Sequence, residues 1–581
     1  MANVLIIVIA ALFVVAAAEL FADRIGIAAP ILLLLMGGAV ALIPGMPEVE
    51  VEPDLVLMII LPPLLYSSAV NMPGSDFRRN LAPISVLAVV LVAISAAVVG
   101  FFVDKMVPGI GIAAAIALGA IVSPTDAVAT SIVKEAGVSR RVVAVLNGEG
   151  LINDASALVI LGSAVGAMTS QISAGKVVLD FVLAVVVAVI VGWLVGRLMI
   201  WLRSKVREAT PDTLLSLATP FLAFLPAEHL HGSGLVAAVV AGLVVSHQAP
   251  RKLTPTQRTS SQATWNALML MLESAVFLLM GLELTAIVED LEADSFGWKL
   301  AVAVAAVALA TTLVVRSFII AALLAWLARR SKRRSEQRDY LERASKRIND
   351  ATSISEVAPI TGPAAAQRLS KLRHRLSRSI SDLDYYIEHP LGPREGTVMI
   401  WAGMRGAITL AAAQTLPLNT PHRSFLVFVA FLVAAASLLI QGGTLGLVVR
   451  LVKPAEEEGI DPEEEVEIRG LMRRAARSVP TPPAITELLE KQDGFEPGEE
   501  NEAHERAMSL ALRERLQASP EHRRLFADLS REYAVELIIA QREALLDAND
   551  EGSFNPDAVG AALDRLDADQ IALETRTSTL N

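Results

Sequence analysis

The stretch "GAIVSPTDAVATSIV", residues 119–133, begins and ends like a membrane-spanning helix but is polar in its middle. Ser123, Pro124, Thr125 and Asp126 follow one another there. Proline removes a backbone donor and clashes with the preceding turn, so the helix should break at this point. Broken backbone at membrane depth is tolerated only where it is buried in protein or lines a cavity. The freed backbone groups and the carboxylate are therefore suited to hold a cation.

The chain around this stretch is equally apolar. Of its 581 residues 53% are hydrophobic, and the mean hydropathy of +0.52 is too high for a soluble protein of this size. A spanning helix needs roughly 20 mostly apolar residues, whereas barrel strands alternate in short segments. The continuous runs predict an all-α polytopic membrane protein. About thirteen transmembrane helices are expected, near residues 3–21, 26–43, 54–70, 82–102, 108–133, 143–168, 176–200, 211–228, 232–247, 264–285, 299–327, 396–415 and 424–451.

The charges of the short loops predict the orientation of these helices. One set of loops is basic, with Arg78, Arg79, Lys134, Arg140, Arg141, Arg203, Lys205, Arg207, Arg251, Lys252 and Arg258. The alternate loops, at 44–53, 169–175 and 288–297, are neutral or acidic. Because basic loops stay inside, we expect a multi-pass protein of the cell (inner) membrane, with the N-terminus outside and the C-terminus cytoplasmic.

Two domains are expected from the composition. Residues 1–452 form the transmembrane domain, with a cytoplasmic loop at 328–395. The basic start of that loop is explained either by the positive-inside rule or by contact with anionic lipid headgroups. Residues 453–581 form an acidic cytoplasmic tail with helical amphipathic stretches, for which we predict a regulatory role.

Several classes of function are excluded by what the sequence lacks. It has no cysteine, no Walker loop, no nucleophile elbow and no HExxH motif, so we expect neither an enzyme nor a cofactor. The net charge of −11 and the absence of a basic stretch interleaved with aromatics argue against nucleic acid as a partner.

Ionisable residues inside the predicted spans are the candidates for function. Each costs about 2.5–3.5 kcal/mol at the bilayer centre. In residues 144–168, Gly150 and Asp154 share one helix face, and Glu149 and Asn153 share the next. One carboxylate can therefore point at the Asp126 break while the other points into the bundle.

Three further charged residues lie deep in apolar runs. Arg316 needs a carboxylate partner, and Glu149 is the first choice. Glu273 is either structural or part of the site. Arg405 is flanked by Gly403 and Gly406, so its helix should also be interrupted, although an interfacial arginine is an alternative.

The two interrupted segments are the fifth and the twelfth predicted spans. If spans 1–6 and 8–13 are two inverted six-helix repeats, these segments are equivalent. Interrupted helices in corresponding positions are the best sequence indication of a transporter's midplane site. A lone buried Asp can be explained by packing, but Asp126 and Asp154 in adjacent spans are hard to explain that way.

These motifs resemble a known family in the order in which they occur. They are "LPPLLYSSA" (61–69), "GAIVSPTDAVA" (119–129), "NGEGLINDASALV" (147–159), "LESAVFLLMG" (272–281), Arg316 and "GMRGAITLA" (403–411). Over about residues 1–452 the chain is similar to sodium/proton antiporters of the monovalent cation/proton antiporter superfamily. The branch is that of the animal sodium/proton exchangers and the bacterial and archaeal NhaP proteins.

The resemblance implies roles for individual residues. Asn153 and Asp154 match the family's Asn-Asp pair, in which the aspartate carries the proton or the cation. Asp126 and the Thr125 backbone match the broken-helix side of that site, and Glu149 with Arg316 matches a structural ion pair. Relatives are homodimers with a fixed dimer domain and a moving six-helix core.

Two positions depart from the family pattern. Many relatives carry an acid where this chain has Ser67, and some carry a serine where it has Gly150. Both changes remove an oxygen that could coordinate a cation, and they bear on ion selectivity and affinity. The loop at 328–395 is also longer than the family leads us to expect.

The expected function is antiport of Na⁺, and of Li⁺ with it, for H⁺ by alternating access, in the service of pH homeostasis. Proton and cation compete for Asp154 and Asp126, and Asp154, Asp126 and Thr125 form the Na⁺ site together with Asn153. Accessory roles are open to four further residues: Glu273, Arg405, Ser123 and Ser67. Two alternatives remain: a K⁺/H⁺ antiporter, and a monovalent cation channel that would pass current without proton flux.

Overall fold

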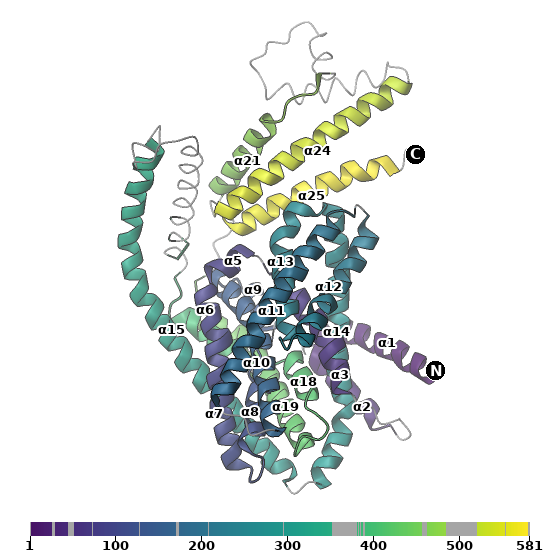
Figure 1. The fold of residues 1–581 in the computed structure, drawn as a ribbon, viewed down its shortest axis with the longest axis vertical. Helices are drawn as coiled ribbons and strands as arrows, with labels where there is room; N and C mark the ends of the chain where they lie inside the picture. Colours follow the sequence, from purple (N-terminus) through teal and green to yellow (C-terminus); the bar gives the residue numbers. More distant parts are fainter. Residues whose placement is uncertain are drawn as a thin grey trace. The chain divides into compact units, whose positions relative to one another are not determined.

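The computed structural model describes most of the chain as helix and contains no β-strand in the residues it describes. These are 2–25, 29–43, 52–72, 74–126, 128–169, 174–206, 208–293, 296–350, 380, 383, 385–386, 390–455, 462–483, 520–551 and 554–578. Two compact units are present (Figure 1). One comprises Met1–Asp339 with Leu383–Glu457, and the other comprises Tyr340–Asp382 with Glu458–Asn581.

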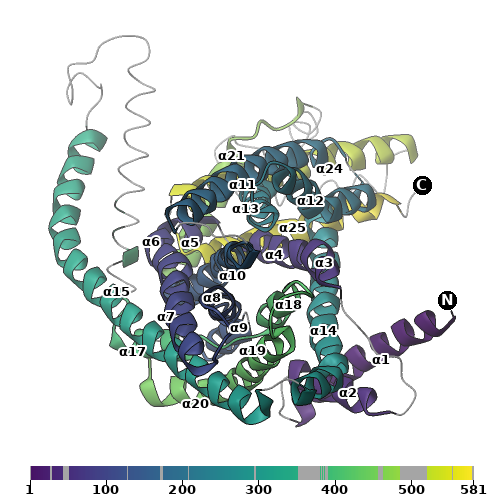
Figure 2. The same ribbon diagram turned by 60° about the horizontal axis from the view of Figure 1, so that its bottom comes forward.

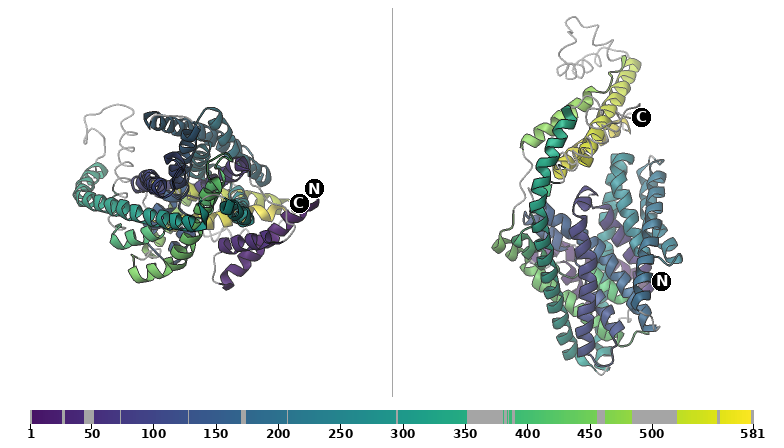
Figure 3. Two further views of the ribbon diagram at one scale, coloured as in Figure 1. Left: turned by 90° about the horizontal axis from the view of Figure 1, so that it is seen from below. Right: turned by 60° about the vertical axis from the view of Figure 1, so that its left-hand side comes forward.

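The first unit is a bundle of helices that run beside one another (Figure 3). Its first half contains α1 (Ala2–Ile25), α2 (Ala29–Ala41), α3 (Pro53–Leu55), the π-helical turn η1 (Val56–Ile60), α4 (Leu61–Val70), α5 (Gly74–Arg79), α6 (Leu81–Ser85), the π-helical turn η2 (Val86–Val90), α7 (Leu91–Met106), α8 (Ile112–Ile121), α9 (Val128–Glu135) and α10 (Arg140–Thr169). Its second half contains α11 (Ala174–Arg203), α12 (Ala209–His229), α13 (Gly234–Lys252), α14 (Pro255–Ala293), the greater part of α15 (Gly297–Asp350), α17 (Pro393–Trp401), α18 (Ala407–Gln414), α19 (Arg423–Ser437), the π-helical turn η4 (Leu438–Gly442) and α20 (Gly443–Val452).

Each of the thirteen predicted ranges overlaps a helix or consecutive helices in the described residues. Seven helical segments are both long and apolar enough to cross a membrane: Pro53–Val70, Leu81–Met106, Arg140–Met168, Phe181–Arg203, Pro255–Glu283, Gly297–Arg330 and Arg423–Val452. Shorter apolar helices are Ala11–Ala22, Leu32–Ala41 and Ile112–Ile121. The chain is therefore a multi-pass membrane protein, while the number of thirteen crossings and the inverted repeat stay predictions.

Both predicted helix interruptions are present. The first separates α8 from α9 at Pro124, and the second separates α17 from α18 at residues 402–406. The two extended segments cross, because the amide of Asp126 donates to the carbonyl of Met404 at 2.8 Å. Figure 2 shows α8, α9, α10 and α18 together in the middle of the bundle. Each break thus supplies some of the backbone partners that the other lacks.

The end of the loop at 328–395 is packed against the membrane unit. The ring of Tyr385 lies under the guanidinium of Arg79, with 5.0 Å from Cζ to the ring centroid, and Tyr386 lies 4.9 Å from Cζ of Arg141. The amide of Asn80 donates to the Tyr385 hydroxyl at 3.1 Å. Arg79 and Arg141 are among the bases that the sequence assigns to short loops, and the structure shows that both side chains are buried. Cation–π contacts with the two tyrosines compensate their loss of water.

The described part of the tail is helical, as its amphipathic pattern predicts. Helices α21 (Pro462–Arg477), α24 (Pro520–Glu551) and α25 (Pro556–Ser578) pack together around a small apolar core that includes Ile468 and Leu545. The pair Arg542 and Asp567, 2.7 Å apart, joins α24 to α25. Its regulatory role stays a prediction.

Candidate ion-binding site

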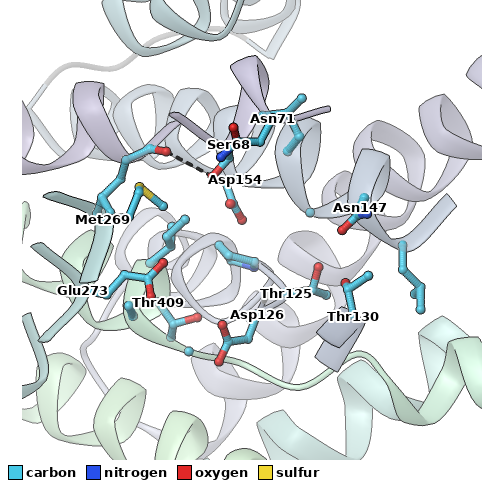
Figure 4. A pocket seen from close by; sticks show the side chains of 18 of the residues that line it. Ser68, Asn71, Thr125, Asp126, Thr130, Asn147, Asp154, Met269, Glu273 and Thr409 are labelled. Carbon is cyan, nitrogen blue, oxygen red and sulfur yellow. Dashed lines mark hydrogen bonds between the residues drawn. The ribbon is translucent and has the colours of Figure 1, made fainter. Parts of the chain in front are cut away.

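A cavity of about 240 Å³ lies beside the crossing of the two broken helices. Three carboxylates line it: Asp126 from the first break, Asp154 from α10 and Glu273 from α14 (Figure 4). The remaining lining consists of Leu64, Ser68, Asn71, Met72, Pro124, Thr125, Thr130, Leu146, Asn147, Gly150, Leu151, Met269, Gly406, Ala407, Ile408 and Thr409. The predicted residues Asp154, Asp126 and Thr125 are thus brought to one cavity.

Asp154 has a free acceptor in this cavity. Its side chain is buried, and its Oδ1 has no hydrogen-bond partner among the residues that the structure describes. A buried carboxylate oxygen without a partner carries a large desolvation penalty, which a bound proton or cation would relieve. The side chain of Asp154 is therefore available for a positively charged ligand.

The cavity opens toward the end of α10 that begins at Arg140. Along α10, Asn147 is exposed, Gly150 is partly exposed and Asp154 is buried. Asn71, at the end of α4, is exposed beside the same opening. Water and ions can therefore reach the carboxylates from this face of the membrane unit.

Apolar side chains close the opposite direction. Ile60, Val276, Met280 and Leu410 are all buried, and the void that they line together with neighbouring residues measures about 10 Å³. A void of that size holds at most one water molecule. Among the described residues, those that line this void therefore leave no wide path to the carboxylates from this direction.

The first break is held open by hydrogen bonds from α10. The side-chain amide of Asn153 donates to the carbonyl of Ser123 at 3.3 Å and lies 3.5 Å from the hydroxyl of Thr125. The hydroxyl of Ser123 donates to the carbonyl of Gly119 at 2.8 Å, so it is occupied within its own helix end. Asn153 Oδ1 has no partner among the described residues. The structure thus places Asn153 against the break, with one acceptor left over.

Arg405 in the second break binds the ends of two helices. Its Nε donates to the carbonyl of Val122 at 2.8 Å, at the end of α8, and its Nη1 donates to the carbonyl of Gly403, at the end of α17. The backbone amide of Arg405 donates to the hydroxyl of Ser437 at 2.9 Å. Because helix C-termini carry partial negative charge, a buried guanidinium is favourable between them. The alternative of an interfacial arginine is wrong, since Arg405 is only 3% exposed.

Two glycines of the second break allow close approach of charged groups. A Cβ at Gly403 would overlap the guanidinium of Arg316, at 2.5 Å from its Nε. A Cβ at Gly406 would overlap the carboxylate of Asp126. The "GMRG" sequence is thus explained on both sides of Arg405, because any side chain there would displace a charged neighbour.

The predicted partners Glu149 and Arg316 are placed together. Arg316 Nη2 donates to Glu149 Oε2 at 2.9 Å, and Nη1 donates to Oε1. The Nε of Arg316 donates to the carbonyl of Met399 in α17 at 2.9 Å. Both side chains are fully buried. The pair connects α10, α15 and α17 behind the two breaks, and it does not line the cavity.

The remaining predicted residues are divided between the cavity and its surroundings. Glu273 lines the cavity, whereas Ser67 is buried outside it. Its neighbour Ser68 lines the cavity instead and donates to the carbonyl of Leu64 at 3.0 Å. The helical spacing of Leu64, Ser68 and Asn71 would have identified this face of α4.

A second buried ion pair escaped the sequence analysis. Arg203 binds Asp212 through two hydrogen bonds of 2.8 Å and also donates to the hydroxyl of Ser216 at 3.2 Å. Trp265 donates to that hydroxyl at 2.9 Å, so the network joins α11, α12 and α14. The sequence assigns Arg203 to a basic loop, whereas the structure places it as the last residue of α11 with a buried side chain. An aspartate at the start of an apolar helix, nine residues after a base, was the available signal.

Comparisons with known proteins agree with this architecture. An uncharacterised Na⁺/H⁺ exchanger of Mycobacterium tuberculosis is 27% identical over 461 residues, which cover 78% of this chain and 75% of that protein. The Na⁺/H⁺ antiporter ApNhaP of Aphanothece halophytica is 24% identical over 69% of this chain and 65% of its own. The solved structure of the sodium proton antiporter MjNhaP1 from Methanocaldococcus jannaschii at pH 8 matches with a TM-score of 0.54 at 15% identity. That match covers 77% of this chain and 99% of the other, and at this identity it shows the fold alone.

The assignment rests on the match of the whole membrane unit. The family model described as "Sodium/hydrogen exchanger, transmembrane" matches residues 7–451, which include both breaks, the three cavity carboxylates and the Glu149–Arg316 pair. The chain belongs to the sodium/hydrogen exchanger family of membrane antiporters.

Proposed function

We propose that this chain exchanges Na⁺, and Li⁺ with it, for H⁺ by alternating access, with proton and cation competing for Asp154 and Asp126. The observation that carries the proposal is the carboxylate of Asp154, which has a free oxygen in a cavity that Asp126 also lines. A site with two neighbouring acids in a dry environment favours a positive ligand of either kind. Because both ligands neutralise the same charge, binding of one opposes binding of the other.

The side chains around the cavity fit a small alkali cation. Na⁺ is a hard cation that prefers oxygen ligands, and Asp154, Asp126 and Thr125 supply carboxylate and hydroxyl oxygens. The hydroxyl of Thr409, which lines the cavity, is a further oxygen without a protein partner among the described residues. So is Oδ1 of Asn153, a residue that lies beside the first break but is not among those that line the cavity. Among those residues no group of three or more His, Asp or Glu side chains is placed to hold a metal ion. The ion in this proposal is cargo.

The one-sided cavity supports alternating access. The open face leads to Asp154, and the buried apolar residues around Leu410 close the other direction. Moving an uncompensated charge through an apolar environment is costly, so the carboxylates should change sides only when they hold a proton or a cation. This requirement for a bound proton or cation is enough to couple the flux of Na⁺ to the flux of H⁺.

Exchange in proteoliposomes tests the proposal. We expect wild-type protein to acidify or alkalinise vesicles when a Na⁺ gradient is imposed, and Asp154→Asn to lose this activity. Asp104→Asn, which removes an acid at the end of α7 far from the cavity lining, is the matched control and should retain it. Full exchange by Asp154→Asn would disprove the proposal.

The pH dependence provides an independent test. Protons compete with Na⁺ for one site, so lowering the pH should raise the apparent KM for Na⁺ and leave the maximal rate at saturating Na⁺ unchanged on the loading side. One pH unit corresponds to 1.36 kcal/mol, so a 1:1 exchanger can hold about a tenfold Na⁺ gradient per unit. Equilibrium gradients measured over two pH units give the stoichiometry.

K⁺/H⁺ exchange is the second candidate. A relative from Bacillus pumilus, 31% identical over 44% of this chain and 39% of its own, is named a sodium, potassium, lithium and rubidium/H⁺ antiporter. A side chain at Gly150 would contact Thr125, since a Cβ there lies 3.8 Å from its Oγ1, so glycine leaves the site wider at this position. Competition among Na⁺, Li⁺ and K⁺ on purified protein separates the two candidates. Conductance without proton flux would instead indicate the monovalent cation channel.

In the same proposal the protein is a homodimer of the cell membrane, with an external N-terminus, a cytoplasmic C-terminus and a role in pH homeostasis. The alternation of basic and acidic loops supports the orientation. Because the chain has no cysteine, single cysteines introduced near the two ends of the membrane unit can be labelled from one side without background. Ala2→Cys and Ala455→Cys should react from opposite sides of the membrane.

A further inference from the structure

A shallow groove on α11 lies outside the ion site. It has a volume of about 410 Å³ and is lined by Trp193, Leu194, Arg197, Leu198, Trp201 and Lys252. The first five are on α11, and Lys252 is the last residue of α13. Trp193, Arg197 and Trp201 follow at intervals of four residues, so they share one face of the helix. The groove therefore combines two aromatic rings, two leucines and two cations.

This face of α11 is turned away from the protein. Only 22% of the apolar window in Phe181–Arg203 is buried, the lowest value among the seven candidate spans, although its mean hydropathy is 2.5. Trp193, Leu194, Leu198 and Trp201 are each about half exposed. A long apolar helix with an exposed apolar face must meet the acyl chains of the bilayer.

Arg197 is the anomalous residue on this face. It lies six residues before the end of α11, about 9 Å along the helix axis. It is exposed, and neither it nor Lys252 has a hydrogen bond or ion pair among the described residues. No acidic residue lines the groove. A guanidinium among apolar side chains at this depth needs an anion, and none is supplied by the described part of the chain.

We propose that the groove binds the headgroup of an anionic phospholipid. Arg197 and Lys252 bind the phosphate of the headgroup, Leu194 and Leu198 contact the acyl chains, and Trp193 and Trp201 flank the boundary between the two. Guanidinium–phosphate pairs form paired charge-assisted hydrogen bonds, and tryptophan is favoured at the headgroup level. Basic pockets between transmembrane helices commonly bind such headgroups.

Occupancy of the groove would stabilise the scaffold behind the ion site. Helix α11 packs against α13, and α13 packs against α4, whose Leu64 and Ser68 line the cavity. A lipid that bridges α11 and the end of α13 holds this pair together. The effect is on stability of the fold, so it is measurable without transport activity.

Tryptophan fluorescence tests the proposal directly. The full chain in phosphatidylcholine nanodiscs is titrated with brominated phosphatidylglycerol, whose bromine atoms quench nearby indole rings. We expect quenching at a low fraction of the anionic lipid, and we expect Trp193→Phe with Trp201→Phe to lose most of it. Arg197→Gln with Lys252→Gln should require about a tenfold higher lipid fraction for half-quenching.

Arg450→Gln is the matched control, because Arg450 is an exposed base at the end of another span. It should leave the titration with brominated phosphatidylglycerol unchanged. Brominated phosphatidylcholine should quench wild type more weakly than brominated phosphatidylglycerol at the same fraction, and to the same extent in wild type, in Arg450→Gln and in Arg197→Gln with Lys252→Gln. A loss in Arg450→Gln as large as that in the Arg197 and Lys252 variant, or quenching of wild type by the neutral lipid as strong as by the anionic lipid, would overturn the proposal.

Two further measurements test for other occupants of the groove: a free phosphate ester and a second copy of the chain. Soluble glycerol 3-phosphate should not reverse the quenching, and reversal at millimolar concentration would indicate a site for free phosphate esters. Trp201→Cys should not cross-link to a second copy in lipid. An efficient cross-link would mean that another copy of the chain covers this face, and it would overturn the lipid assignment.

Discussion

Both interrupted helices contain a short extended break, and the two breaks carry charged side chains of opposite sign. The break between α8 and α9 carries Asp126, which is partly exposed and lines the cavity. The break between α17 and α18 carries Arg405, which is buried and donates to the carbonyls of Val122 and Gly403. The arginine of one break is buried against backbone carbonyls, whereas the aspartate of the other break lines the cavity.

This difference follows from the ends of the four short helices. Two helix C-termini meet at Arg405, and their partial negative charges are compensated by one guanidinium. The carboxylate of Asp126 lies against Gly406, at the start of α18, where the partial charge is positive. Arg405 is bound to backbone carbonyls and does not line the cavity, whereas Asp126 does.

Removing Arg405 should produce the largest effect on this arrangement. Arg405→Ala leaves buried carbonyls of two helix ends without a partner, at about 1–3 kcal/mol each. We expect a large loss of folded protein and of the thermal midpoint, measured by size-exclusion chromatography after heating. Arg405→Lys should recover little, since a lysine lacks the planar fork that reaches two carbonyls. Wild-type stability of Arg405→Ala would contradict the proposed compensation.

Substituting Gly403 or Gly406 by alanine should distinguish the role of the first break in exchange from the role of the second break in stability. Gly406→Ala pushes the carboxylate of Asp126 away, so we expect exchange to be lost while folded protein is still recovered. Gly403→Ala collides with Arg316 and should mainly reduce stability. Gly162→Ala in α10, where a Cβ meets open space, is the control for both. If both variants lost stability equally and exchange equally, the division of roles between the breaks would be wrong.

Thr125→Val tests the break that carries Asp126, because valine has nearly the same volume as threonine but lacks the hydroxyl. The variant removes a hydroxyl that lines the cavity and lies near the amide of Asn153. Loss of one hydrogen-bonding or coordinating group costs about 1 kcal/mol, so the apparent KM for Na⁺ should rise about fivefold. The maximal exchange rate should change little. An unchanged apparent KM for Na⁺ would show that the Thr125 hydroxyl does not contribute to ion binding.

Gly150→Ser should have the smallest effect. A Cβ at this position lies 3.8 Å from Thr125 Oγ1, so a serine side chain fits. It adds an oxygen on the side of the cavity where this chain lacks one. We expect the apparent KM for Na⁺ to fall by about twofold, with a larger change for Na⁺ than for K⁺. Exchange assays with each ion measure the difference, and an equal change for both would show that position 150 does not influence selectivity.

Much of this site was predictable from residue types alone. Pro124 indicates the first break and Gly403 with Gly406 the second, because these residues weaken or prevent regular helix. The pairing of Glu149 with Arg316 followed from the cost of an unpaired buried charge. The burial of Arg203, Arg79 and Arg141 was not predicted, because the rule for loop charges cannot tell a solvated arginine from one buried against partners distant in sequence.

The sequence by itself determined that the chain spans a membrane, where its helices break and which acids lie at membrane depth, because these depend on local hydropathy and backbone chemistry. Only the tertiary structure decided that Asp126 lines the cavity while Arg405 is buried against backbone carbonyls. It brings the amide of Asp126 to the carbonyl of Met404 and Arg405 to Val122, and both contacts join residues about 280 positions apart. Such long-range contacts depend on how helices cross, and no local pattern encodes that geometry.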